Sequence, residues 1–256
     1  MPGGWIVNKK RLDATLTEMG LVSTRSQAES WIKLGKVTVD GKVVTKPGFF
    51  VRDDATIKLN TKEQYVSRAG LKLASVAKLL GVRFDGATVL DVGSSTGGFT
   101  DYSLQNGAQK VYAVDVGTDQ LHPSLQGHEK IELHEKTDIR DFVPSEVPDI
   151  IVIDVSFISL RDILPHLAAT SVGPNTKIMA MVKPQFEAHR DQTAKGVIKN
   201  DAVRRKILQD FELWAKDLFV IQDKRDSEVA GAKGNRERFY LLTLKRNSTT
   251  SSGRMM

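Results

Sequence analysis

Apolar residues fall into strand-length runs over most of the chain. From Leu71 onward these runs alternate with helix-length amphipathic segments. In chain order the runs read ATVLDV, KVYAVDV, KIEL, PDIIVIDV, KIMAMVK, DLFVIQD and RFYLLTLK. Strands that alternate with helices usually form a parallel sheet that helices cover on both faces. We therefore predict an α/β, Rossmann-like domain with a seven-stranded, mostly parallel sheet over residues 71–246.

The beginning of the chain has a helical period instead. Apolar positions spaced three and four apart predict a helix over residues 10–22 that ends near Gly20. Thr24, followed three residues later by Gln27, is typical of a capping box at the start of a second helix. Gly35 is placed to end that second helix.

Two short β-branched runs follow, one on each side of Asp40 and Gly41. An Asp-Gly pair between such runs predicts a hairpin with a two-residue turn, and residues 49–59 can supply further strands. We expect a small α+β domain over residues 1–60 and a polar linker over 61–70. The Ser- and Thr-rich tail at 247–256 has no period, so we expect it to be disordered.

Composition limits the class of protein. The chain has 256 residues, a net charge of +6 and no cysteine, which excludes disulfides and thiolate metal sites. No apolar run reaches the roughly 18 residues of a membrane span, and no signal peptide is visible, so we expect a cytoplasmic protein. Residues 1–65 carry eleven Lys and Arg against seven Asp and Glu. This excess favours a polyanion partner, although a solvated basic face would give the same count.

The stretch DVGSSTGGF ends a predicted strand in an acid and continues as a glycine-rich loop. Ser95 stands where a dinucleotide fingerprint needs a glycine, and Phe99 stands where a Walker loop needs its lysine. An adenosine cofactor without phosphates fits better. The carboxylate of Asp91 suits the positive charges of S-adenosylmethionine (SAM), and the glycines let the backbone approach a ligand closely. We therefore predict SAM as the cofactor.

Two further acids lie at suitable positions for such a cofactor. Asp115 ends the next predicted strand, close to the offset at which α/β folds place the acid that binds a ribose. Asp138 is placed to meet the adenine, although an aspartate of a surface turn is an equal alternative. The predicted cofactor-binding residues are Asp91, Gly93, Ser94, Ser95, Thr96, Gly97, Gly98, Phe99, Asp115 and Asp138.

Four charged residues adjoin predicted strands where catalysis is expected. Asp154 and Lys183 follow the fourth and fifth apolar runs, and the carboxyl ends of parallel strands are where such sheets bind ligands. Lys72 precedes the cofactor strand, and Glu237 precedes the last strand. The set resembles the Lys-Asp-Lys-Glu sites of ribose 2′-O-methyltransferases, in which a lysine takes the hydroxyl proton or steers the alkoxide. We assign the central role to Lys183 and an orienting role to Asp154. Lys72 and Glu237 would complete the network, and ordinary surface charges are the alternative for these two.

The segment RLDATLTEMGLVSTRSQAESWIKLGKVTVDGKVVTKPG, residues 11–48, resembles the alpha-L RNA-binding motif. That motif occurs in a small-subunit ribosomal protein, in pseudouridine synthases and in bacterial tyrosyl-tRNA synthetases. The resemblance implies that the helix pair and the hairpin edge face RNA phosphates. The implied RNA contacts are Arg11, Arg25, Ser26, Gln27, Lys33 and Lys36. For Arg25, a cap on its own helix is the alternative.

The motifs SRAGLKL, DVGSSTGGFTD, VDVGTDQL, IDVSFISL, VKPQFE and GNRERF follow this module in order. Together they make the chain similar to the TlyA family, whose catalytic domain is related to the FtsJ RNA methyltransferases. The resemblance implies a SAM-dependent rRNA (cytidine-2′-O)-methyltransferase that needs no metal and acts on ribosomal subunits. The family also often carries the name haemolysin.

Two other classes stay open. A membrane-active haemolysin would need an amphipathic or spanning segment, whereas the apolar runs are typical of sheet core. A ribosome-binding factor without catalysis would need neither the cofactor loop nor the four charged residues, and the sequence contains both.

Overall fold

The computed structural model divides into two compact units, one ending at Gln64 and one starting at Tyr65. The two units are described separately below. The residues that the structure describes are 9–22, 25–33, 35–60, 65–188, 197–198, 200–229, 231 and 234–245. Thr24 of the predicted capping box, residues 61–64 of the predicted linker and the tail at 247–256 lie outside them, as do the side chains of Ser26 and Gln27.

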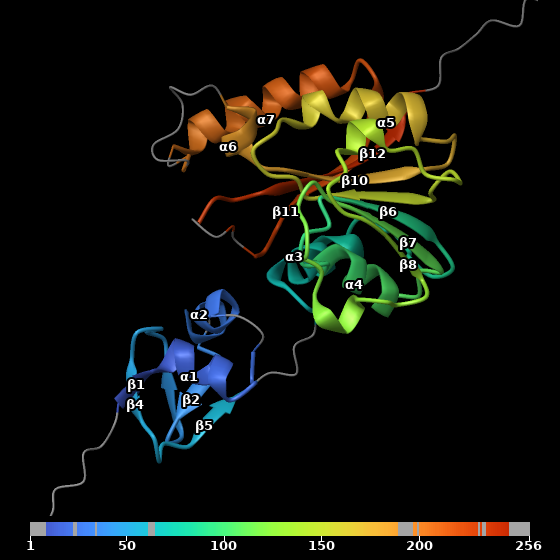
Figure 1. The fold of residues 1–256 in the computed structure, drawn as a ribbon. Helices are drawn as coiled ribbons and strands as arrows, with labels where there is room; N and C mark the ends of the chain where they lie inside the picture. The colour runs from blue at the N-terminus through green and yellow to red at the C-terminus, as the bar shows by residue number, and fades with distance from the viewer. Residues whose placement is uncertain are drawn as a thin grey trace, which may run out of the picture. The chain divides into compact units, whose positions relative to one another are not determined.

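The first unit consists of two helices and two small sheets (Figure 1). Its elements are β1 (Lys9–Arg11), α1 (Leu12–Glu18), α2 (Arg25–Lys33), β2 (Val37–Val39), β3 (Lys42–Val44), β4 (Phe50–Arg52) and β5 (Ile57–Leu59). β2 pairs antiparallel with β3 and β5, and β1 pairs antiparallel with β4. Asp40 and Gly41 both have positive φ, at 49° and 77°, as the predicted two-residue hairpin turn requires.

The start of the first helix differs from the prediction. Residues 10 and 11 belong to β1, and Arg11 is extended, with φ −70° and ψ 136°. Helical spacing alone could not show this, because the strand exists only through its pairing with β4, far along the chain. Leu12, Leu16 and Ile32 are fully buried and form the core between the helices and the sheet.

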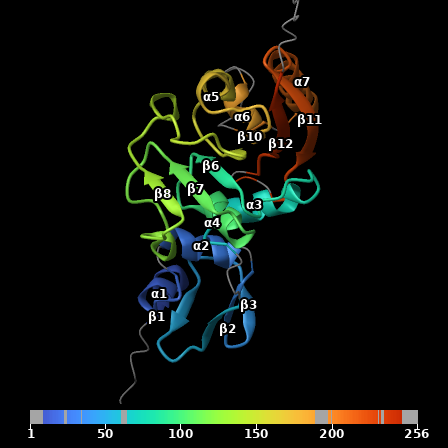
Figure 2. The same cartoon turned by 90° about the vertical axis from the view of Figure 1, so that its right-hand side faces the viewer.

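The second unit is a seven-stranded sheet covered by helices on both faces (Figures 1 and 2). Its strands are β6 (Thr88–Val92), β7 (Lys110–Val114), β8 (Ile131–His134), β9 (Ile150–Ile153), β10 (Lys177–Val182), β11 (Phe219–Asp226) and β12 (Arg238–Leu244). Their order is β11-β12-β10-β9-β6-β7-β8. β12 is antiparallel to both neighbours, and the other pairs are parallel. All seven predicted strands are present, so the predicted fold class is confirmed.

Two apolar layers hold this sheet. α3 (Arg68–Ala77) and α4 (Gly98–Gln105) pack on one face, and α5 (Leu164–Thr170) and α7 (Asp201–Ala215) pack on the other. Short helices, η1 (Pro123–Leu125), η2 (Ile139–Asp141), η3 (Leu160–Asp162) and α6 (Pro184–Glu187), lie in loops between strands and helices. The central strands β6 and β9 are buried at every residue, as expected for parallel strands between two helical layers.

Residues 65–70, which the sequence places in the linker, pack on the second unit. Tyr65 is buried in the core beside α3, its ring centroid 5.5 Å from that of Tyr102. The backbone N–H of Val66 donates to Asp101 of α4 at 2.7 Å. This segment is polar in sequence, so only the tertiary contacts reveal that it belongs to the second unit. No described helix is long and apolar enough to cross a membrane.

Candidate active site

The glycine-rich loop joins the end of β6 to the start of α4. Gly93 and Gly97 have φ of 81° and 91°, conformations that side chains rarely adopt. A Cβ on Gly93 would lie 2.8 Å from the carbonyl oxygen of Asp154. The loop therefore passes close to the end of β9, and this approach needs a residue without a side chain.

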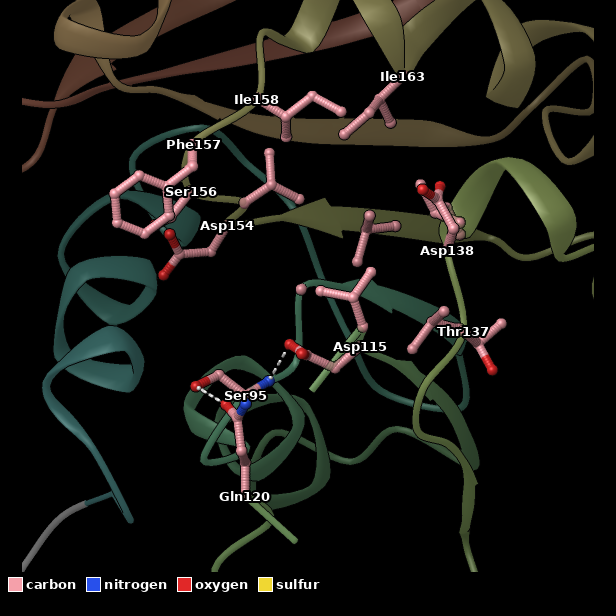
Figure 3. A pocket seen from close by; sticks show the side chains of 16 residues that line it. Ser95, Asp115, Gln120, Thr137, Asp138, Asp154, Ser156, Phe157, Ile158 and Ile163 are labelled. Atoms are coloured by element: carbon pink, nitrogen blue, oxygen red, sulfur yellow. Dashed lines mark hydrogen bonds between the residues drawn. The ribbon is translucent and has the colours of Figure 1, made fainter. Parts of the chain in front are cut away.

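A cavity of about 360 Å³ opens beside this loop, at the carboxyl ends of β6, β7 and β9 (Figure 3). Its walls are apolar residues with several acids between them. The lining residues are Val92, Gly93, Ser95, Val114, Asp115, Val116, Gln120, Thr137, Asp138, Ile139, Asp154, Val155, Ser156, Phe157, Ile158 and Ile163. A mostly apolar pocket with a few convergent polar groups is typical of a site for a small ligand.

Asp115 lies at one wall of this cavity. Its carboxylate accepts backbone N–H groups from Ser95 at 2.8 Å and Gly117 at 2.7 Å. The hydroxyl of Ser95 donates to the side-chain oxygen of Gln120 at 3.0 Å (Figure 3). Asp115, Ser95 and Gln120 therefore form a polar edge of the cavity in which the aspartate keeps acceptor capacity for a hydroxyl ligand.

Asp138 also lines the cavity, but its carboxylate has an internal partner. Arg140 donates to it through Nε at 3.0 Å and Nη2 at 2.6 Å, and the backbone N–H of Arg140 adds a third bond at 2.9 Å. The Arg140 side chain is the main cause that lowers the pKa of Asp138 to about 2. This geometry supports the alternative of a turn aspartate and leaves adenine recognition by its carboxylate a prediction.

Asp91 is fully buried at the end of β6. One carboxylate oxygen accepts the hydroxyl of Thr100 at 2.6 Å, and the other has no hydrogen-bond partner among the described residues. Burial raises the pKa of Asp91 to about 7, and the nearby Asp154 adds to the increase. A buried carboxylate with a free oxygen is a ready acceptor for a cationic ligand.

A second cavity, of about 140 Å³, adjoins the first, since Gly93, Ser95, Asp154 and Ser156 line both. Its remaining lining residues are Ser67, Ala69, Asp91, Ser94, Thr96, Phe99 and Lys183. The predicted cofactor loop and the two central predicted catalytic residues therefore meet in one place. Gly97 and Gly98, the two remaining loop residues, line neither cavity. Gly97 lies against Leu121 and Leu125, and Gly98 is in tight contact with Ser67 and Gly70.

Lys183 and Asp154 form an ion pair at the boundary of the two cavities. The Nζ atom of Lys183 lies 2.6 Å from Oδ1 of Asp154 and donates to the hydroxyl of Ser156 at 2.8 Å. Both charged side chains are largely buried, with 11% and 15% of their surface exposed. β10 and β9 are adjacent parallel strands, so their carboxyl ends bring the two charges together.

Lys72 and Glu237 form a second ion pair, with Nζ and Oε2 2.6 Å apart and side-chain exposures of 11% and 4%. The pair joins α3 to the residue before β12. Two residues from distant parts of the chain are thus buried against each other, which excludes the alternative that they are ordinary surface charges. Removing one partner of such a buried pair would leave the other charge buried without compensation.

Phe157 and Ser156 were not predicted as site residues, although both lie in the quoted motif IDVSFISL. Phe157 is 91% exposed and has a φ of 68°, an unusual conformation for an aromatic residue. Its ring centroid lies 5.2 Å from that of Phe186. Gln120 was also missed, although it lies in the quoted motif VDVGTDQL.

In the first unit, Arg11 and Arg25 share the buried carboxylate of Asp13. Arg11 donates to it at 2.7 and 3.1 Å, and Arg25 donates at 3.2 Å. Asp13 is fully buried, and these bonds lower its pKa to about 2, Arg11 being the largest cause. Lys33 pairs with Glu29 at 3.7 Å, and Lys36 is exposed.

No group of three or more His, Asp or Glu side chains within the described ranges is arranged to hold a metal ion.

The second unit has the features of a Rossmann-like methyltransferase: a sheet covered on both faces, the antiparallel strand β12, the glycine loop and the two cavities. It follows a small basic unit in the chain. Residues 65–245 match the family described as FtsJ-like methyltransferase, and residues 10–57 match the S4 domain.

The similarity to known relatives covers most of the chain. The chain is 33% identical over 254 residues to the 16S/23S rRNA (cytidine-2′-O)-methyltransferase TlyA of Mycobacterium tuberculosis, covering 96% of this chain and 94% of the relative. It is 42% identical over 181 residues to the 23S rRNA (cytidine-2′-O)-methyltransferase TlyA of Campylobacter jejuni, covering 70% of each. A solved structure of a proposed hemolysin from Streptococcus thermophilus has a TM-score of 0.73 at 38% identity, covering 94% of this chain and 90% of the other. The chain therefore belongs to the TlyA family of FtsJ-like methyltransferases.

Proposed function

We propose that this chain transfers the methyl group of SAM to the ribose 2′-hydroxyl of a cytidine in ribosomal RNA. The observation that carries the proposal is the Lys183–Asp154 ion pair at the boundary of two adjoining cavities. Relatives of the family are named for this reaction on 23S rRNA, or on 16S and 23S rRNA. Such an enzyme would work in the cytoplasm, where ribosomal subunits are found.

The residues around the two cavities fit SAM. The larger cavity offers the carboxylate of Asp115 to the ribose hydroxyls and apolar walls to the adenine. The smaller cavity offers the unpaired oxygen of Asp91 to the positive groups of the methionine part. Gly93 lines both cavities, and a side chain there would meet Asp154, so the glycine lets the backbone pass between the ligand and the end of β9.

The proposed mechanism uses the two ion pairs. SAM supplies an electrophilic methyl group bound to a positively charged sulfur. Lys183 steers the 2′-oxygen of the acceptor: its ammonium passes one proton to the carboxylate of Asp154 and takes the hydroxyl proton in its place. Asp154 is thus the net proton acceptor, and Lys183 stays charged beside the 2′-oxygen on which negative charge develops. Asp154 and Ser156 hold the ammonium of Lys183 in place. The Lys72–Glu237 pair lines neither cavity and would support the site from outside by holding α3 against the start of β12.

Phe157 extends the site towards the acceptor. Its exposed ring beside Asp154 offers a surface on which the base of the target cytidine can stack once it leaves its helix. The basic S4 unit would dock on rRNA through Arg11 and Arg25, and by family resemblance also through Ser26, Gln27, Lys33 and Lys36. Binding through phosphates predicts an affinity that falls steeply with salt.

The decisive experiment measures transfer of radiolabelled methyl from SAM to purified 30S and 50S subunits that lack the modification. The native chain should label RNA at a linkage that resists alkaline hydrolysis, and Lys183→Ala should not. Testing both subunits also identifies which of them is the substrate. Label on neither subunit, despite measurable SAM binding, would overturn the rRNA assignment and leave the cofactor assignment standing.

A further inference from the structure

The outer face of the β1–β4 ribbon in the S4 unit carries an exposed aromatic ring among cations. The register pairs Arg11 with Phe50 and Lys9 with Arg52. Paired positions of an antiparallel ribbon point to the same side. Phe50 is 59% exposed, whereas its neighbour Val51, on the opposite side, is 3% exposed and belongs to the core. The ribbon therefore buries Val51 on one side, beside the exposed Lys10–Glu18 pair, and presents three cations and a phenylalanine on the other.

The position of Arg11 on this face is fixed by its neighbours. Asp13 holds its guanidinium at 2.7 and 3.1 Å, and the Pro47–Phe49 turn is tied to the start of α1 by backbone hydrogen bonds. A Cβ on Gly48 would lie 3.5 Å from the guanidinium, so the group lies against this turn. A positioned cation, Arg11, and the exposed ring of its register partner Phe50 therefore lie side by side.

We infer that this outer face binds an unpaired nucleotide of RNA, with its base stacked on Phe50 and its flanking phosphate held by Arg11. Exposed aromatic rings among cations are how proteins bind unstacked bases, because the ring supplies stacking while the cations neutralise phosphates. A regular duplex offers phosphates but no free base face, so it would use only the cations. The inference rests on the proposed function, since it names the RNA feature to which the S4 unit docks.

The test compares two RNA hairpins of equal length and charge, one fully paired and one with a single-nucleotide bulge. Binding of the full-length chain is measured by fluorescence anisotropy over a series of salt concentrations. A 2-aminopurine at the bulge reports stacking directly. The native chain should prefer the bulged RNA, and Phe50→Ala should lose about 5- to 100-fold in affinity for it alone. The salt slope should not change, because no charge is removed.

Matched variants separate stacking from apolar packing. Phe50→Trp should keep the preference for the bulge, and Phe50→Leu, which retains bulk without an aromatic face, should lose it. Leu213→Ala removes a 66% exposed apolar side chain from α7 and should change the affinity for neither hairpin. Lys9→Gln should lower the affinity for both hairpins equally and reduce the salt slope by about one.

Three outcomes would overturn the inference. Native protein that binds both hairpins equally has no site for an unpaired base. A Phe50→Ala variant that still prefers the bulged hairpin, or that loses affinity for both hairpins equally, shows that the ring does not stack on the bulged base. Native protein that binds neither hairpin would also remove the proposed S4 docking, whereas methyl transfer to ribosomal subunits, measured separately, decides the proposed function.

Discussion

The ammonium of Lys183 is held by two oxygens from the loop after β9, Oδ1 of Asp154 at 2.6 Å and the hydroxyl of Ser156 at 2.8 Å. The lysine itself follows the neighbouring strand β10. Its position thus depends on the pairing of two strands and on the turn that follows one of them. The pair is the part of the site whose removal should affect the chemical step most.

Lys183→Met should reduce methyl transfer by about 10²- to 10⁴-fold, as expected when a group that handles the reacting proton is removed. Affinity for SAM, measured by calorimetry, should change only a few-fold, because the proposed ribose and amino contacts are made by other residues. Lys177→Met is the matched control, since Lys177 is an exposed lysine at the opposite end of the same strand. A variant at 183 that keeps full transfer would remove Lys183 from the mechanism.

Asp91 predicts that SAM binds more weakly in acid. Burial raises the pKa of Asp91 to about 7, so below pH 7 the carboxyl must lose a proton before it can pair with a cationic ligand. The affinity for SAM should therefore fall by up to about tenfold per pH unit below 7. Asp91→Asn should bind SAM more weakly and without this pH dependence. Native affinity that stays constant from pH 5.5 to 8 would contradict the prediction.

The same group predicts the pH dependence of stability in the absence of SAM. The pKa of Asp91 is higher in the folded protein than its ordinary value of 3.8, so the folded state binds more protons between about pH 4 and 7. The free energy of unfolding should fall as pH rises through that window, relative to Asp91→Asn. Urea unfolding of both proteins at pH 5 and 7.5 checks this. The free energy of unfolding of the native protein minus that of Asp91→Asn should be lower at pH 7.5, and a value that stays constant or rises with pH would contradict the prediction.

The seven strands of the second unit follow from their sequence because each is an apolar run of suitable length between helical segments. The acid-glycine loop was also recognisable, since Asp91, Gly93 and Gly97 occupy fixed positions after a strand. Lys72 and Glu237 could be proposed only from motif resemblance. Their contact crosses from α3 to β12, and no spacing along the chain encodes it.

Other features depend on contacts that the sequence pattern does not contain. β1 is a strand only because it pairs with β4, and Tyr65 leaves the predicted linker because it fits a space beside α3. Phe157 lies in a recognised motif, yet its exposure and its positive φ are set by the loop that carries it. Asp138 has the position of an adenine-binding acid, but Arg140, two residues away, pairs with it.

Glu187 should act as a positioning residue for the loop after β9. Its carboxylate accepts the hydroxyl of Ser159 at 2.6 Å and the backbone N–H of Leu160 at 2.7 Å. Glu187→Ala leaves both donors without this partner, so it should cost about 1–3 kcal/mol of stability and lower methyl transfer. Glu187→Gln can accept from the N–H and donate to the hydroxyl. It should therefore retain most of the stability and most of the methyl transfer. Equal losses in the two variants would contradict a role through these hydrogen bonds.

Asp13 should stabilise the S4 unit at neutral pH and lose that effect in acid. Its folded pKa of about 2 lies below its ordinary value of 3.8, so the stabilisation is present above about pH 4 and is lost as pH falls towards 2. Asp13→Asn should lower the free energy of unfolding by about 1–3 kcal/mol at pH 7. Asp53→Asn, a change of an exposed acid, is the control. Circular dichroism during urea unfolding measures the stability of both variants. The prediction would be contradicted if Asp13→Asn were as stable as the native chain at pH 7.

Phe157 should show a conflict between stability and activity. A φ of 68° costs a phenylalanine about 1–2 kcal/mol, whereas asparagine tolerates this conformation well. Because the ring is 91% exposed, Phe157→Asn removes little packing, so the melting temperature should stay equal or rise. The kcat/KM for the ribosomal subunit should fall about tenfold or more if the target base stacks on this ring, while SAM affinity stays within a few-fold. Phe157→Tyr keeps the aromatic face and should retain most of the activity. If Phe157→Asn transfers methyl groups as well as the native chain, the strained ring has no role in holding the acceptor.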